Sequence, residues 1–150
     1  MSISFGGQQI GPDKSFQEFI ISCSHGTGIK NLTTSDVDQK PFRRSVDVWF
    51  FALCLAVRKG LKPQKVETPY NMIEGSILAD WQSNAIALIA STETEGLDVI
   101  TDSRKMLRIA NELANAGMPE VKLIIEKPDM SPLWTISETC RELLKGNERA

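Results

Sequence analysis

The segment from Phe42 to Pro63, FRRSVDVWFFALCLAVRKGLKP, is the most apolar stretch of the chain and has basic residues near both ends. Asp47 is the only charged side chain between Arg44 and Arg58. As a helix, residues 46–57 would span about 18 Å at about 1.5 Å per residue, whereas the hydrocarbon core of a bilayer is about 30 Å thick. The segment is therefore too short to cross a membrane, and its apolar side chains must be covered by protein.

Local signals predict where this helix begins and ends. Ser45 can open it, with Asp47 near its positive end, while Arg58 and Lys59 lie near its negative end. Gly60 suits the turn that ends a helix. A helix that is apolar on every side needs cover on every side. It is therefore either the centre of the domain, or it is shared between the domain and a second subunit.

The remaining apolar patterns also favour helices. Stripes with three- and four-residue steps predict helices at about 77–92 and 101–116, and Ser131 before Pro132 starts a last one. The second of these is expected to end at Gly117. The predicted buried residues are Leu78, Trp81, Ala85, Leu88 and Ile89, then Met106, Ile109, Leu113 and Ala116, then Leu133, Ile136, Cys140 and Leu143.

The N-terminal part has a different character. Residues 1–14 predict a loop or a short edge strand, and Ser15 with Glu18 forms a capping-box pattern before a short helix, SFQEFIISC. The composition of residues 24–41 predicts a long polar loop, and that of residues 61–76 predicts a connector. PEVKLIIEKPD fits either a short helix or a strand.

Length and composition indicate a single soluble domain. The chain has 150 residues, 24% of them charged and 41% hydrophobic, as is ordinary for one soluble domain. We expect a mostly α, compact multi-helix domain around a central apolar helix, with residues 1–41 as a loop-rich N-terminal segment and 42–145 as the helical core. Three widely spaced cysteines, of which Cys54 and Cys140 are expected to be buried, predict a reduced cytoplasmic protein, and the N-terminus lacks the pattern of a signal peptide.

Basic residues are concentrated around the apolar helix, although the net charge is −2. Residues 41–68 hold six basic against two acidic residues, and residues 69–150 hold eight against thirteen. In an oligomer, symmetry would bring such residues together into a phosphate-binding groove. The plainer interpretation is a solvated rim that pairs with the acidic half. The predicted DNA- or partner-binding residues are Arg43, Arg44, Arg58, Lys59, Lys62 and Lys65.

No motif for catalysis, a metal or a cofactor is convincing. His25 is the only histidine, and a base at this position would need Asp36 or Asp38 to fold back toward it. The plainer role is a loop histidine bonded to backbone or water. GTGIKNLTT, residues 26–34, lacks the Gly-Lys-Ser/Thr ending of a phosphate loop. Zinc-ligand spacing is absent from the sequence.

Two groups of acidic residues are weaker candidates. Glu93, Glu95, Asp98 and Asp102 are explained as solvated helix caps. EVK, residues 120–122, has the Glu-x-Lys form of metal-dependent nucleases. Glu120 and Lys122, with Asp13 as a third residue, therefore form an alternative enzymatic hypothesis.

Three stretches together resemble a known family. They are FRRSVDVWFFALCLAVRKGLKP, then NAIALIAST before an acidic turn, then IANELANAGMPEVKLII. These are similar to the small accessory proteins encoded beside bacterial DNA phosphorothioation (Dnd) modification and restriction genes. The resemblance covers roughly residues 42–126, and it assigns no catalytic residue.

The resemblance implies a cytoplasmic, non-catalytic accessory subunit of a DNA-modification or antiviral defence assembly. Its partners would be DNA or a larger protein complex, and we expect a homo-oligomer. A structural adaptor that binds protein through its apolar helices and has no DNA affinity is the alternative from another class.

Overall fold

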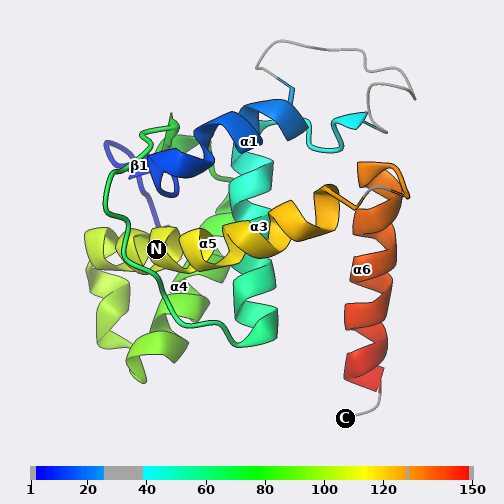
Figure 1. Ribbon diagram of the computed structural model, residues 1–150. Helices are drawn as coiled ribbons and strands as arrows, with labels where there is room; N and C mark the ends of the chain where they lie inside the picture. The colour runs from blue at the N-terminus through cyan, green and yellow to red at the C-terminus, as the bar shows by residue number, and fades with distance from the viewer. Residues whose placement is uncertain (1–2, 26–38, 128, 149–150) are drawn as a thin grey trace.

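The computed structural model of the protein describes residues 3–25, 39–127 and 129–148. The described chain is mostly α-helical, which confirms the predicted fold class. In Figure 1, α3 and α5 cross steeply at the centre, α4 lies toward one end of α5, and α6 stands at the other. The helices are α1 (Gln17–Cys23), α3 (Ser45–Lys59), α4 (Asp80–Thr94), α5 (Ser103–Ile125) and α6 (Pro132–Glu148).

A small antiparallel sheet joins the N-terminal segment to the connector. Strand β1 (Gln9–Ile10) pairs with β2 (Ile73–Glu74), with Gln9 opposite Glu74. The edge strand near the N-terminus is confirmed, but its partner strand lies in a segment that was predicted only as a connector. Short 3-10 helices are found at Lys14–Phe16, Gly75–Ile77 and Asp98–Thr101.

Helix α3 is the central helix, and it starts at Ser45 as predicted. At its N-terminus, Asp47 Oδ2 accepts a hydrogen bond from Arg44 N at 3.0 Å. At its C-terminus, Gly60 adopts a left-handed conformation with φ 66°, which glycine allows without steric cost. Trp49 has 0% of its surface exposed. Among the described residues, no helix has both the length and the apolarity that a membrane span requires.

The fold leaves one stripe of α3 uncovered. Val57 is 44% exposed, Cys54 is exposed and Phe50 is half-buried. These positions recur at steps of three and four residues and therefore share one side of the helix. The expectation that Cys54 is buried is wrong, because it lies on the side of α3 that the chain's own helices do not cover. Cys140, on α6, is half-buried rather than buried.

Helix α5 is longer than the sequence predicts. It runs through Gly117 and Pro119 to Ile125, so the expected end at Gly117 is wrong and the ambiguous PEVKLII stretch is helical. Internal proline costs a helix about 3 kcal/mol and glycine about 1 kcal/mol. Burial of Met118, Val121 and Ile124 contributes about 1.5–3 kcal/mol for each side chain, which offsets that cost.

Gly117 permits the close crossing of α3 and α5. A Cβ atom at this position would lie 2.1 Å from the carbonyl oxygen of Ala52 and 2.8 Å from its carbonyl carbon. A backbone atom of a buried helix cannot move aside easily, because interiors are close-packed. Glycine is therefore required here by the helix crossing, although its local preference is to end a helix.

Helix α4 buries a different face from the predicted one. Leu78, just before the helix, is buried as predicted, but Trp81 is 64% exposed and Leu88 is 71% exposed. The buried residues of the helix are Gln82, Ser83, Ile86, Ala87 and Ala90. Three of these five residues are small and let the helix backbone approach its neighbours closely, while Ile86 supplies the large apolar side chain of the buried face. The predicted stripe is therefore wrong by about one residue, or about 100° around the helix.

Two helix starts complete the comparison. Ser15 does not cap α1 as predicted, because it lies inside the 3-10 helix Lys14–Phe16 that precedes α1. The cap of this 3-10 helix is Asp13, whose Oδ1 accepts a hydrogen bond from Ser15 N at 3.0 Å. Helix α6 begins at Pro132 after Ser131 as expected. Its predicted stripe of Leu133, Ile136, Cys140 and Leu143 is only half-buried.

Replacing Gly117 with Ala should destabilise the protein because the added Cβ atom would collide with the Ala52 carbonyl. We expect the free energy of unfolding to fall by about 2 kcal/mol, despite the better helix propensity of alanine. The matched control is Gly96→Ala, where the nearest atom to the added Cβ lies 4.0 Å away. Urea denaturation followed by circular dichroism measures both variants, and equal midpoints would contradict the proposed crossing.

Candidate nucleic-acid interface

The predicted basic residues lie at opposite ends of α3. Arg43 and Arg44 precede the helix, and Arg58, Lys59, Lys62 and Lys65 lie at or beyond its C-terminal turn. Fifteen residues of helix separate the two groups by about 20 Å. One protein chain therefore does not combine the six side chains into one patch.

Internal structural partners are found for Arg44, Lys59 and Arg58. The Arg44 guanidinium pairs with Asp47 at 3.2 Å, and Lys59 pairs with Glu120 of α5 at 2.9 Å. Arg58 donates a hydrogen bond to the carbonyl oxygen of Leu143 in α6 at 2.7 Å. These contacts hold α3 to its own first turn, to α5 and to α6. They make the three residues poor candidates for the main contacts with DNA.

A different hollow gathers basic side chains, and we call it the basic cleft. It has a volume of about 450 Å³ and is bounded by residues of three segments, 7–11, 65–71 and 104–112. Lys65, Arg104 and Arg108 line it together with one acidic residue, Glu112. The structure thus joins one predicted residue, Lys65, to two arginines, Arg104 and Arg108, that the sequence did not single out.

Two asparagines of α5 hold the other two segments in place. Asn111 Oδ1 accepts hydrogen bonds from Gly11 N at 3.1 Å and from Trp49 Nε1 at 3.0 Å. Asn115 Oδ1 accepts from Asp13 N at 3.0 Å, and its Nδ2 donates to the carbonyl oxygen of Lys65 at 3.3 Å. Residues four apart share one face of a helix, so α5 fixes the N-terminal segment and the connector side by side.

Further contacts join the N-terminal segment directly to the connector. A Cβ atom at Gly11 would lie 1.7 Å from the carbonyl oxygen of Tyr70, so only glycine fits there. The Asp13 carboxylate accepts hydrogen bonds from the backbone N–H groups of Thr68 at 3.0 Å, Glu67 at 3.1 Å and Ser15 at 3.0 Å. These bonds, the one from Thr68 above all, hold the pKa of Asp13 below its usual value. The walls of the basic cleft are therefore tied to each other as well as to α5.

The charges of the basic cleft are available to a ligand. Among the described residues, the side chains of Lys65 and Arg104 have no hydrogen-bond or ion-pair partner. Arg108 makes only a long contact, with its Nε 4.0 Å from Glu112 Oε1, and 66% of its side chain is exposed. Three cations and one carboxylate leave a net positive cleft that suits an anionic ligand.

The sequence shows only the α5 part of this site. Arg104, Arg108, Asn111, Glu112 and Asn115 recur at three- and four-residue steps and mark one polar side of α5. A polar stripe on an amphipathic helix is usually a solvated face. Only the folded chain shows that Lys65 and the N-terminal segment lie against it.

A second hollow, which we call the aromatic hollow, lies between the N-terminal part of α3 and the first turn of α4. It has a volume of about 360 Å³, and Phe42, Phe50, Phe51, Cys54 and Trp81 line it. Phe50 and Trp81 meet edge to face with ring centroids 5.3 Å apart, a favourable aromatic geometry.

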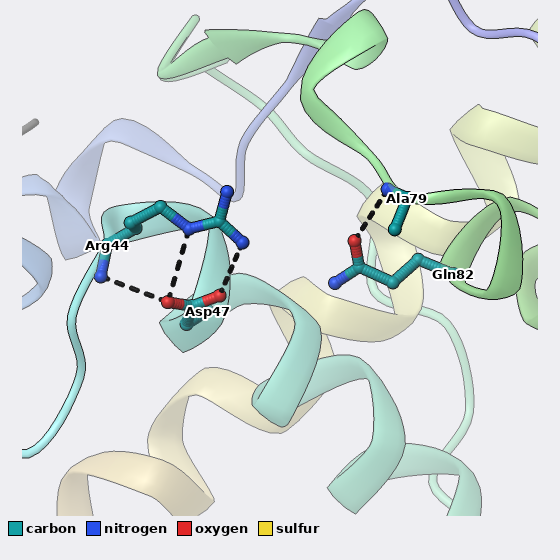
Figure 2. Close-up of polar contacts among 4 residues, drawn as sticks. All are labelled: Arg44, Asp47, Ala79 and Gln82. Carbon is teal, nitrogen blue, oxygen red and sulfur yellow. Dashed lines mark hydrogen bonds and ion pairs between the residues drawn. The ribbon is translucent and has the colours of Figure 1, made fainter.

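Two helix caps form the polar edge of the aromatic hollow. Figure 2 shows Asp47 accepting hydrogen bonds from Arg44, and Gln82 Oε1 accepting one from Ala79 N at 2.9 Å. The caps satisfy these polar groups internally. What remains open to a partner is largely the aromatic surface.

The candidate catalytic residues have structural roles. His25 is buried, and its Nε2 lies 2.9 Å from the carbonyl oxygen of Lys40, as the plainer interpretation predicted. Burial raises the pKa of Cys23 to about 12, so a thiolate is not present near neutral pH. Asp36, Asp38 and the Gly-rich 26–34 stretch lie outside the described residues.

The Glu-x-Lys motif lies on a helix. Side chains two residues apart on α5 point about 200° apart, so Glu120 and Lys122 diverge. Glu120 instead pairs with Lys59, and Asp13 is engaged by backbone N–H groups. In the part of the chain that the structure describes, no group of three or more His, Cys, Asp or Glu side chains is arranged to hold a metal ion.

Comparisons with protein-family models, with curated proteins and with solved structures return no match. The resemblance to accessory proteins of the Dnd systems therefore stays a prediction. The function has to be argued from the two hollows.

Replacing Asp13 with Ala should make the protein less stable at neutral pH, because three backbone N–H groups lose their acceptor. The folded-state pKa of Asp13 is lowered from 3.8. Its contribution is therefore fully present above that value and is lost as the pH falls through the lower, folded-state pKa. Urea midpoints of wild type and variant should differ at neutral pH and converge in acid. Asp129→Ala, at an exposed position, is the control, and a pH-independent difference would contradict this role.

Proposed function

We propose that this protein is a non-catalytic accessory subunit of a bacterial DNA-modification or antiviral defence assembly, and that it binds the DNA backbone through the basic cleft. The assembly is suggested by the resemblance of residues 42–126 to the Dnd-associated accessory proteins. The binding surface is suggested by the structure, and it differs from the one that the sequence predicted.

The observation that carries this proposal is the convergence of Lys65, Arg104 and Arg108 on one preformed cleft. The three cations come from two segments that Asn115 joins by a hydrogen bond to the Lys65 carbonyl. Phosphate groups are bound mainly by Lys and Arg side chains, and release of their counterions drives the association. Cationic side chains that extend from a fixed backbone and have few internal partners can make such contacts without first breaking others.

Binding of a partner protein through the aromatic hollow is the second candidate function. The specific observation in its favour is the exposure of Trp81, at 64%, beside Phe50 and Cys54. Aromatic residues in a hollow with a satisfied polar edge are typical anchors of protein interfaces. The two candidates are compatible in an accessory subunit, which needs one surface for DNA and another for its assembly.

The double variant Arg104→Ala/Arg108→Ala should bind DNA more weakly. Removal of each phosphate-binding cation should reduce the magnitude of the slope of log affinity against log salt by about 0.7–0.9, so the slope should become shallower by about 1.4–1.8. Fluorescence anisotropy with a short labelled DNA at several salt concentrations measures both quantities. The matched control, Lys122→Ala/Lys127→Ala, removes the same charge from exposed positions outside the cleft.

Equal weakening of DNA binding in the two double variants would show that only net charge matters, and would contradict the basic cleft as the DNA site. If the wild-type protein binds no DNA at low salt, the DNA-binding function is contradicted and only the adaptor function is left. Pull-down from the native host with and without nuclease then identifies the protein partner.

A further inference from the structure

The basic cleft has the volume of a small-ligand pocket and is partly open to solvent. Its volume of about 450 Å³ lies in the range of about 300–1,000 Å³ that is usual for sites that enclose one small ligand. The surface of a DNA duplex is convex and presents its bases only within its grooves. A duplex can therefore touch the rim of such a pocket, whereas an unpaired nucleotide can enter it.

The interior of the basic cleft suits a base. Tyr70, which is half-buried, lines it together with Leu107, Val66 and Pro69. The backbone of Tyr70 is fixed, because its N–H donates to the carbonyl oxygen of Pro12 at 3.0 Å. Apolar and aromatic side chains of this kind bind the flat faces of bases without selecting among them.

The polar groups of the basic cleft suit the edges of a base. Gln9 and Asn71 line it, and both are exposed. Among the described residues, neither side chain has a hydrogen-bond partner. An amide side chain offers both donors and an acceptor, as base edges do. Asn111 also lines the cleft, but its side-chain oxygen already accepts hydrogen bonds from Gly11 N and Trp49 Nε1 and is therefore not available to a base.

We infer that the basic cleft binds an unpaired nucleotide, with the base between Tyr70 and the apolar wall and the phosphates on either side near Lys65, Arg104 and Arg108. The protein would accordingly prefer single-stranded DNA to duplex DNA. This inference rests on the proposed function, because it names the form of DNA that the same site takes.

The test compares a labelled single strand with the duplex of the same sequence, by anisotropy at several salt concentrations. Wild type should bind the single strand about tenfold more tightly, since stacking of one base contributes about that much. For three phosphate contacts, the slope of log affinity against log salt should be about −2 for the single strand. Tyr70→Leu should remove most of the preference and leave the salt dependence, and Asn71→Ala should weaken single-strand binding alone.

Each possible result of this test either supports or overturns the inference. Equal binding of both forms, or a preference that survives in both variants, would overturn it. The proposed function would still stand if Arg104→Ala/Arg108→Ala weakened binding of both forms. Absence of DNA binding by wild type would overturn both. If circular dichroism shows that Tyr70→Leu is unfolded, the test uses the wild-type ratio of single-strand to duplex affinity and the variant Asn71→Ala. The Asn71 side chain is exposed, so its removal should not unfold the protein.

Discussion

The close crossing of α3 and α5 is the constraint on which the rest of the structure depends. It is possible because Gly117 places no side chain against the Ala52 carbonyl, where a Cβ atom would lie 2.1 Å from the oxygen. The crossing buries Trp49 and Leu113 completely. It also sets the direction of α5 (Figure 1). The side chains that α5 presents to the N-terminal segment and the connector take their positions from that direction.

One helix thereby connects the core to the candidate site. The apolar side of α5 packs on α3, and its polar side carries Asn111 and Asn115, which bind the backbone of the two cleft walls. Asn111 makes the connection directly, because it accepts hydrogen bonds from the buried Trp49 of α3 and from Gly11 of the cleft wall. A fixed framework of this kind lowers the entropy that ligand binding must overcome.

The elements that sequence could predict are those decided by local chemistry. Helix α3 begins at Ser45 and is followed by Gly60, as its end signals indicate, and α6 starts after Ser131 for the same reason. The errors have tertiary causes. Gly117 indicates a helix end in the sequence but permits a helix crossing in the fold, and α4 buries Gln82 and Ser83, which hydrophobicity alone would not choose. The basic cleft brings Lys65 close to Arg104 and Arg108, although Lys65 is far from both arginines in the sequence. The local concentration of basic residues along the chain therefore predicted only Lys65 of these three.

The central claim is that a nucleic acid occupies the basic cleft, between walls that α5 holds together. Amide chemical-shift mapping during titration with single-stranded DNA tests it most directly, because it reports the location of binding residue by residue. We expect shifts concentrated in residues 7–11, 65–71 and 104–112, the three segments that bound the cleft, with little change near Trp81. Shifts centred on the aromatic hollow or on the first turn of α3, with the cleft unaffected, would contradict it.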